Sequence, residues 1–299
     1  ISDPDYLQVV FAEFTSTDGL MHPVGRDRVI HRLMVSDDER QVLKEKGIKL
    51  VAQIWGADPD KYYLAAKFIC EEMDFDGIDI NFGCPVKKIV KQGCCSALID
   101  KPELAKEIVE ATKEASDLPV SVKTRTGLKK HDTVRWINDV IDMDPAAITL
   151  HGRSQKMMSD YPADWIEIRR AVEVKNIRRP DIPLIGNGDI TSIGDADEKM
   201  ERSGADGAMV ARGIFSDPWI FNPKKEEPGP EEKLRLLWAH AKRFSDYWGE
   251  RRSFLIIRRF FKIYTSNFRN ASVIRAALME TQNIKEVEEV LNKCEYDVF

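Results

Sequence analysis

The pattern of hydrophobic and polar positions divides the first two thirds of the chain into repeated strand–helix units. Short, nearly continuous apolar runs alternate with stretches whose apolar residues recur at helical spacing. Such runs are typical of parallel strands that are covered on both faces. Their alternation with helices predicts right-handed crossovers and a parallel α/β sheet. The seven predicted strands span residues 7–14, 49–55, 77–81, 119–124, 146–151, 182–187 and 206–211.

Seven strands are compatible with two α/β architectures. A closed (β/α)8 TIM barrel needs eight strands, whereas a doubly wound open sheet can have seven. The strand ends decide between them, because each predicted strand is apolar inside and polar at its carboxyl end. In a barrel these ends converge on one face, where the active site lies. The polar residues at the strand ends are Glu13, Gln53, Asn81, Cys84, Lys123, Arg125, His151, Arg153, Asn187, Asp189 and Arg212.

The periodicity changes after residue 222. Residues 224–230 are rich in proline, glycine and charge, which is typical of a linker. From residue 231 onwards the apolar positions recur only at helical spacing, so we expect a small helical bundle. The predicted organisation is therefore a barrel over 1–223, a linker over 224–230 and an all-helical domain over 231–299.

Charge is distributed unevenly over the 299 residues. The whole chain carries −5, but eleven basic residues oppose two acidic ones between Lys233 and Arg275, a net charge of +9. The rest of the chain therefore carries −14. A basic module on an acidic body indicates a polyanionic partner, although a solvated helical face would give the same count.

Composition argues against several classes of protein. No apolar run approaches the roughly 18 residues of a membrane span, and no secretory signal is visible, so we expect no membrane partner. Five cysteines at irregular spacing predict neither a disulfide framework nor a zinc site, and they favour a reducing, cytoplasmic compartment. We predict no metal site. The chain also lacks the G-x-S-x-G motif that a serine hydrolase would need.

Two glycine-containing loops follow the last two predicted strands, with the sequences GNGDI and ARGIF. In a barrel, the loops at these positions form the usual phosphate site. Glycines 186, 188 and 213 allow backbone N–H groups to approach an anion closely. Together the loops predict a phosphate-bearing cofactor.

Cys84 follows the predicted strand 77–81, on the polar face, and Pro85 fixes the backbone directly after it. A cysteine there could be a nucleophile, a redox thiol or a proton donor. A nucleophile needs an activating base, whereas a proton donor needs a neutral thiol with a pKa near or above about 8. Cys94 and Cys95 are interpreted as packing residues.

Five motifs, in order, closely resemble those of the tRNA-dihydrouridine synthases of bacterial type. They are DINFGCPVKKIVKQGCCSALI, SVKTRTG, ITLHGRSQ, IGNGDI and GADGAMVARG. The resemblance implies an FMN-dependent (β/α)8 barrel with a C-terminal helical tRNA-binding domain, and NADPH as reductant. The family's first strand, which ends in APM, has no counterpart before residue 1, so we expect that strand to be missing from this sequence.

The resemblance also implies roles for individual residues. Cys84 corresponds to the family's proton donor. Asn81 and Arg153 correspond to positions near the target uracil. The flavin-binding positions correspond to Gln53, Lys123, His151, Asn187, Gly188, Asp189, Ala211 and Arg212.

Two alternatives remain open at this point. One is an FMN-dependent dehydrogenase of the dihydroorotate or dihydropyrimidine type, although a free pyrimidine needs no segment with a charge of +9. The other is a non-catalytic RNA-binding relative, although the flavin-facing residues are all present.

Overall fold

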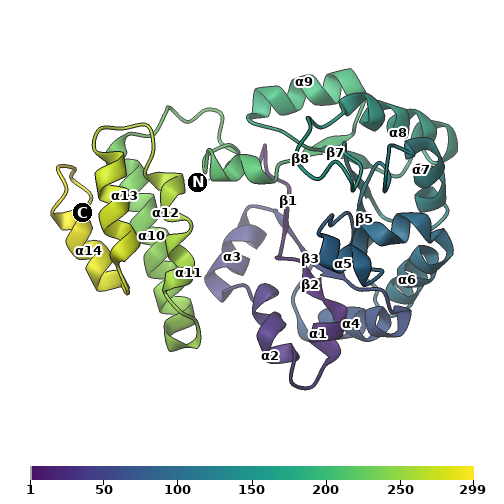
Figure 1. Ribbon diagram of the computed structural model, residues 1–299, viewed down its shortest axis with the longest axis horizontal. Coiled ribbons are helices and arrows are strands. Elements are labelled where there is room, and N and C mark those ends of the chain that lie inside the picture. Colours follow the sequence, from purple (N-terminus) through teal and green to yellow (C-terminus); the bar gives the residue numbers. More distant parts are fainter. Residues whose placement is uncertain (1) are drawn as a thin grey trace. The chain divides into compact units, whose positions relative to one another are not determined.

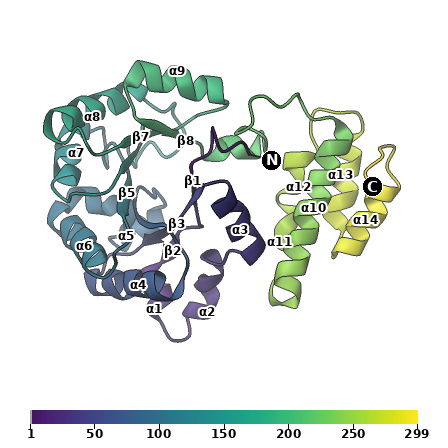
Figure 2. The same cartoon turned by 180° about the vertical axis from the view of Figure 1, so that it is seen from behind.

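The computed structural model describes residues 2–299, which form two compact units, Ser2–Gly213 and Ile214–Phe299. The first unit is a curved sheet surrounded by helices (Figures 1 and 2). The order of the strands follows the chain, β1-β3-β4-β5-β6-β7-β8, with β2 paired to β3, and all pairings are parallel. The strands are β1 (Val9–Phe11), β2 (Thr15–Ser16), β3 (Lys49–Trp55), β4 (Gly77–Phe82), β5 (Val120–Arg125), β6 (Ile148–His151), β7 (Leu184–Asn187) and β8 (Gly207–Met209).

All seven predicted strands are confirmed, most of them within two residues of the predicted bounds. The exception is 7–14, which forms the short β1 and then a break. Beyond the break, β2 pairs further along β3, with Ser16 opposite Trp55. At the break Thr15 Oγ1 donates to the backbone oxygen of Glu13 at 3.0 Å, so the backbone leaves the extended ladder there.

The parallel α/β architecture is thus confirmed. Within residues 2–299 no pairing joins β8 to β1, so the sheet is a half-barrel. A further strand that closes the barrel stays a prediction.

Helices cover the outer face of the sheet, and their ends follow local sequence signals. The Ser36 side chain caps α3 by accepting from the backbone N–H of Glu39, and Pro59 occupies the first turn of α4. The fully buried Trp136 packs on this face of the sheet. The helices are α1 (Thr17–Met21), α2 (Arg26–Val29), α3 (Asp37–Glu45), α4 (Pro59–Glu72), α5 (Lys87–Lys91), α6 (Pro102–Glu114), α7 (Thr133–Ile141), α8 (Trp165–Arg178) and α9 (Ile193–Ser203), with 3-10 turns η1 (Ile30–Arg32), η2 (Cys95–Asp100) and η3 (Arg212–Phe215).

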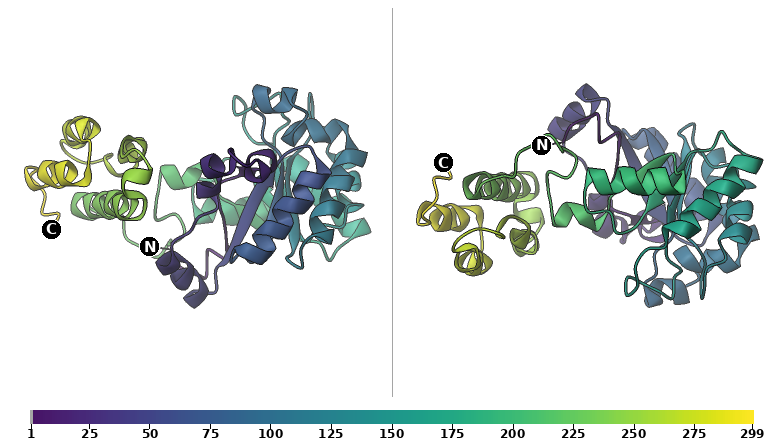
Figure 3. Two further views of the ribbon diagram at one scale, coloured as in Figure 1. Left: turned by 90° about the horizontal axis from the view of Figure 1, so that it is seen from below. Right: turned by 90° about the horizontal axis from the view of Figure 1, so that it is seen from above.

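The second unit contains helices and, among residues 214–299, no strand (Figure 3). Its core is a separate apolar cluster that includes Leu234, Phe261 and Leu278. The predicted linker at 224–230 belongs to this unit, so its role as a domain boundary stays a prediction. No helix in residues 2–299 is long and apolar enough to cross a membrane. The helices are α10 (Pro230–Trp248), α11 (Leu255–Arg258), α12 (Phe261–Tyr264), α13 (Ala271–Glu280) and α14 (Ile284–Asn292), with the 3-10 turn η4 (Gly249–Arg251).

Candidate active site

Polar side chains lie at neighbouring register positions on β3, β4 and β5. Gln53 pairs with Asp79 across β3 and β4, and Asp79 pairs with Ser121 across β4 and β5. One step closer to the carboxyl ends, Asn81 pairs with Lys123. Alternate residues of a strand point to the same side of a sheet, so these five side chains face the inside of the half-barrel. The apolar residues between them pack in the outer core.

Asp79 is fully buried, and neutral donors hold both of its oxygens. Ser121 Oγ donates at 2.6 Å and Gln53 Nε2 at 2.7 Å. The carbonyl oxygen of Gln53 in turn accepts from Asn81 Nδ2 at 2.9 Å. Burial raises the pKa of Asp79 to about 6, a rise that these hydrogen bonds and Lys123 limit. The carboxyl group is therefore mostly ionised at neutral pH.

Lys123 connects this group to β7. Its Nζ donates to Asn187 Oδ1 at 3.1 Å, and Asn187 Nδ2 donates to the backbone oxygen of Met209 in β8 at 2.7 Å. Burial lowers the pKa of Lys123 to about 8, and the charge of Asp79 opposes that fall. Lys123 therefore stays largely cationic at pH 7.

Four hydrogen bonds hold Gly83 and Cys84 in the loop after β4. Asn81 Oδ1 accepts from the backbone N–H groups of Gly83 at 3.0 Å and Cys84 at 2.9 Å. Ser96 Oγ donates to the backbone oxygen of Cys84 at 2.8 Å, and Arg125 Nε to that of Gly83 at 2.8 Å. The position of Cys84 is therefore fixed from β4, β5 and η2.

Cys84 as a whole residue is 9% exposed, and it packs with Cys94 and Cys95. A hydrogen bond from Cys95 is the largest influence and lowers the pKa of Cys84 to about 6, despite burial. The N–H of Val86 and the charge of Arg125 act in the same direction. The same contact with Cys84, together with burial, raises the pKa of Cys95. The packing interpretation of Cys95 is thus incomplete, and the surroundings of Cys84 do not favour the neutral thiol that the sequence argument required.

His151 and Arg153 form a second polar group, on β6 and the loop after it. Burial and the charges of Lys123, Arg125 and Arg153 lower the pKa of His151 to about 2, so its ring is neutral. Arg153 Nη1 lies 3.0 Å from His151 Nε2. A guanidinium can only donate, so Nε2 is the acceptor and Nδ1 carries the ring proton. Arg153 also donates to Asp189 and is itself buried.

The loop after β7 is tightly packed. Gly188 has φ +128°, and a Cβ there would lie 2.5 Å from that of Ala163. Asp189 accepts from the backbone N–H of Ala163 at 2.8 Å, and Arg212 Nη2 lies 3.5 Å from its other oxygen. Arg212 and its neighbour Ala211 are exposed. The predicted flavin positions on the last two strands thus share one face with Lys123 and His151.

Toward the carboxyl ends of β4 to β8, the charged side chains carry an excess of positive charge. Four cationic side chains face two carboxylates there. If Cys84 is ionised as a third anion, an excess of one positive charge remains. No group of metal-ligating side chains is present among residues 2–299. The charged residues are Lys123, Arg125, Arg153 and Arg212, with Asp79 and Asp189.

The chain matches the family model described as dihydrouridine synthase over residues 7–298. A probable tRNA-dihydrouridine synthase of Staphylococcus epidermidis is 39% identical over 99% of this chain and 88% of that protein. The probable tRNA-dihydrouridine synthase 2 of Bacillus subtilis is 36% identical over the same shares. This chain belongs to the dihydrouridine synthase family. Among solved structures, an orotidine 5'-phosphate decarboxylase from Pyrococcus horikoshii has a TM-score of 0.44 at 16% identity, over 73% of this chain and 84% of that one, which is too distant to bear on function.

As a dihydrouridine synthase family member, the chain is an oxidoreductase. The roles predicted for Asn81 and Arg153 near uracil stay predictions, and both side chains are engaged by the protein itself. Sequence reasoning missed two site residues, Asp79 and Cys95. A charged residue inside an otherwise apolar strand was the available signal for Asp79.

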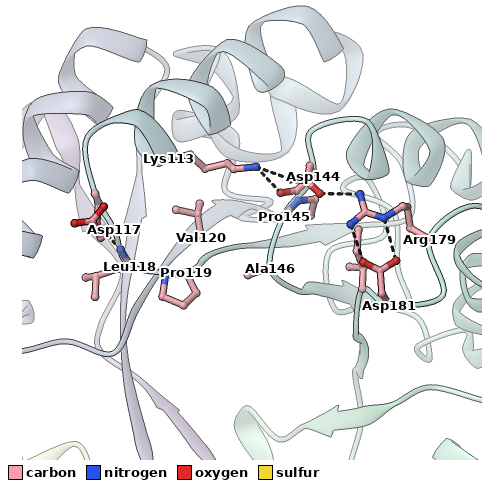
Figure 4. Close-up of a pocket in the computed structure, with 12 residues that line it drawn as sticks. Lys113, Asp117, Leu118, Pro119, Val120, Asp144, Pro145, Ala146, Arg179 and Asp181 are labelled. Atoms are coloured by element: carbon pink, nitrogen blue, oxygen red, sulfur yellow. Dashed lines mark hydrogen bonds and ion pairs between the residues drawn. The ribbon is translucent and has the colours of Figure 1, made fainter.

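A cavity of about 410 Å³ lies at the opposite, amino ends of β5, β6 and β7 (Figure 4). Four of its five charged lining residues pair with one another. Lys113 Nζ lies 2.8 Å from Asp144, and Arg179 lies 2.7 Å from both Asp144 and Asp181. All four side chains are exposed, so this cavity contains no buried charge of the kind found at the carboxyl ends.

Proposed function

We propose that this chain reduces the C5–C6 double bond of uridine in tRNA, with FMN as the bound cofactor and NADPH as the reductant. Dihydrouridine synthases are flavin-dependent oxidoreductases, and the relatives reported above are named as enzymes that act on tRNA. One observation carries the proposal: Cys84 is fixed in a loop at the carboxyl ends of the strands, beside the cationic Lys123.

The residues present fit FMN. The excess positive charge suits a phosphate, and Arg212 with the Gly188–Asp189 loop lies where barrels bind one. The amide of Gln53, the amide of Asn187 and the ammonium of Lys123 can hydrogen-bond the polar edge of a flavin. Bound FMN would supply the hydride that reaches C6 of uracil.

Lys123 and His151 have distinct electrostatic roles in this proposal. Lys123, still largely cationic at pH 7, offsets negative charge on the cofactor. His151 is neutral and offers its Nδ1 proton as a hydrogen-bond donor, because Arg153 occupies Nε2. Neither residue needs to change its protonation state during the reaction.

Cys84 completes the reduction as proton donor. Hydride at C6 leaves negative charge that extends from C5 to the C4 carbonyl, and C5 then takes the proton from Sγ of Cys84. The thiolate that remains is stabilised by Cys95 and Arg125. A pKa of about 6 makes Cys84 a stronger acid but leaves less of it protonated at pH 7. A phosphate-bearing cofactor and an RNA both add negative charge, which raises that pKa.

The second unit supplies the surface for tRNA. Arg251 lies 5.6 Å from the ring centre of Trp248 and 5.7 Å from that of Tyr247, and Arg252 lies 5.2 Å from Trp248. Stacked aromatic and cationic groups are typical of surfaces that bind single-stranded nucleic acids. The net charge of +9 between Lys233 and Arg275 favours phosphate contacts. A cytoplasmic location agrees with this substrate.

The proposal is tested with the full-length protein. Protein purified with flavin should be reduced by NADPH without oxygen, and unmodified tRNA should then reoxidise it. Mass spectrometry of the digested tRNA should show uridine that has gained two hydrogens. A protein that neither retains FMN nor can be loaded with it would contradict the proposal and favour the non-catalytic alternative.

Two controls define the substrate and its binding surface. Dihydroorotate and free pyrimidines should not exchange electrons with the flavin, whereas their rapid turnover would favour the dehydrogenase alternative. Binding of tRNA should weaken steeply with salt. Replacing Arg251 and Arg252 by glutamine should make the binding constant for tRNA less dependent on salt. The slope of its logarithm against the logarithm of the salt concentration should fall in magnitude by about one per lost phosphate contact.

A further inference from the structure

The amides between Asp79 and Cys84 can adopt only one orientation. The backbone N–H groups of Gly83 and Cys84 can only donate, so Asn81 must turn its oxygen toward them. Its NH2 group then faces Gln53, which must present its own oxygen there. The NH2 group of Gln53 therefore faces Asp79, which has to accept. An ionised carboxylate can only accept hydrogen bonds. The acceptor at Asp79 and the N–H donors of the loop therefore require the same orientation of the two amides.

The burial of Asp79 is costly without such a role. A fully buried carboxylate loses its hydration, and an apolar residue of similar size is often at least as stabilising at such a site. The neighbouring positions on the other face of β4 are apolar, so the strand itself needs no charge here. What an apolar residue could not provide is an acceptor for Gln53.

We propose that Asp79 is a positioning residue that orients the carboxamides of Gln53 and Asn81 and thereby holds the Cys84 loop. This inference rests on the proposed function for its catalytic meaning. Asp79 itself touches neither substrate nor cofactor and acts through Gln53 and Asn81. Misplacement of a reacting group by about 1 Å can cost about 10²-fold in rate, so a loop held from within the sheet matters for proton transfer.

Amide hydrogen exchange measures the holding of the loop directly in the full-length protein. The N–H groups of Gly83 and Cys84 should be protected in the parent, and Pro85 contributes no amide signal beside them. Asp79→Leu should raise their exchange at least tenfold while β6 and β7 keep their protection. Asp79→Asn retains one acceptor oxygen for Gln53, so it should restore most of the protection.

Two further variants separate this role from general destabilisation. Ser121→Ala removes a donor to Asp79 that lies outside the path to Cys84, and it should leave the exchange of the loop unchanged. Gln53→Met removes the next side chain in the series of hydrogen bonds, so it should raise the amide exchange of Gly83 and Cys84 as Asp79→Leu does. If Asp79→Leu fails to fold, Gln53→Met still tests the positioning role. In the double variant that combines Asp79→Leu and Gln53→Met, the loop should exchange no faster than in either single variant.

Kinetics supply the second readout. In Asp79→Leu, single-turnover reduction of tRNA should slow by about 10²-fold while the KM for tRNA stays within a few fold of the parent. Unchanged exchange at Gly83 and Cys84 in both Asp79→Leu and Gln53→Met would overturn the positioning role. If exchange rises as expected but the parent reduces no tRNA, the proposed function fails and the positioning role stands.

Discussion

Both ends of the parallel sheet gather charged side chains, but in different environments. At the amino ends, Lys113, Asp144, Arg179 and Asp181 form exposed ion pairs around a cavity (Figure 4). Toward the carboxyl ends, Asp79, Arg125 and Arg153 are buried, although Arg212 is exposed. There burial moves the pKa of Lys123 and Asp79, by lowering the first to about 8 and raising the second to about 6.

The difference teaches that charge alone does not mark a functional site. Exposed ion pairs are screened by water and contribute little to stability. Buried charges must be hydrogen-bonded, so their geometry is fixed and their pKa values shift, and both properties are useful in catalysis. The expected effects of substitutions should therefore be large at the buried groups near the carboxyl ends and small at the exposed ion pairs around the amino-end cavity.

Cys84→Ala should give the largest effect. Loss of the proton donor should slow reoxidation of the reduced flavin by tRNA by about 10²–10⁴-fold, the range typical of general acid catalysis. Reduction by NADPH and retention of flavin should remain near normal. The measurement is single-turnover absorbance without oxygen. A rate within a few fold of the parent would show that another group delivers the proton.

Lys123→Met should weaken retention of FMN by about tenfold or more, because a charge-assisted hydrogen bond is lost at a buried position. Equilibrium dialysis measures the affinity. Lys113→Met at the amino ends is the matched control and should bind FMN like the parent. Equal losses in both variants would remove the distinction between the two ends.

Cys95→Ala should shift the titration of Cys84. A hydrogen bond to the thiolate favours the charged form, so its loss should move the pKa of Cys84 upward from about 6 toward the ordinary value. Carbamidomethylation of Cys84 by iodoacetamide requires the thiolate, and its rate in the cofactor-free parent should rise through about pH 6. Cys94→Ala should leave this midpoint in place. An unchanged midpoint in Cys95→Ala would restore the pure packing interpretation.

Arg179→Gln should have the smallest effect. The variant loses exposed ion pairs with Asp144 and Asp181, and water can solvate these two carboxylates in place of the guanidinium. The melting temperature and the rate of tRNA reduction should match the parent within error. A clear loss of activity would show that the amino-end cavity has a function.

Much of the fold follows from periodicity. Apolar runs at strand length gave all seven strands, because burial on both faces imposes that composition. The break between β1 and β2 was not predictable in the same way. It depends on a side-chain hydrogen bond from Thr15 to the backbone oxygen of Glu13, which leaves the hydrophobic pattern of 7–14 unchanged.

The site was predictable as far as it depends on strand ends. A parallel sheet must bring the residues near the carboxyl ends of its strands to one edge. This accounts for Gln53, Asn81, Lys123, His151 and Asn187. The contact of Cys84 with Cys95 could not be predicted, because it depends on a backbone φ of +54° at Cys95, where the 3-10 turn η2 begins. Spacing along the chain contains no information about that turn.

The agreement between strand order and chain order has a consequence for synthesis on the ribosome. Each pairing joins segments far apart in sequence, as Asp79 and Ser121 do across 42 residues, so no short hairpin can start the sheet. Yet from β4 to β8 each strand emerges when the earlier strand with which it pairs has already been made. The sheet can therefore grow by one edge as translation proceeds. Cys84 can be fixed only after β5 has arrived, because Arg125 on that strand holds its loop.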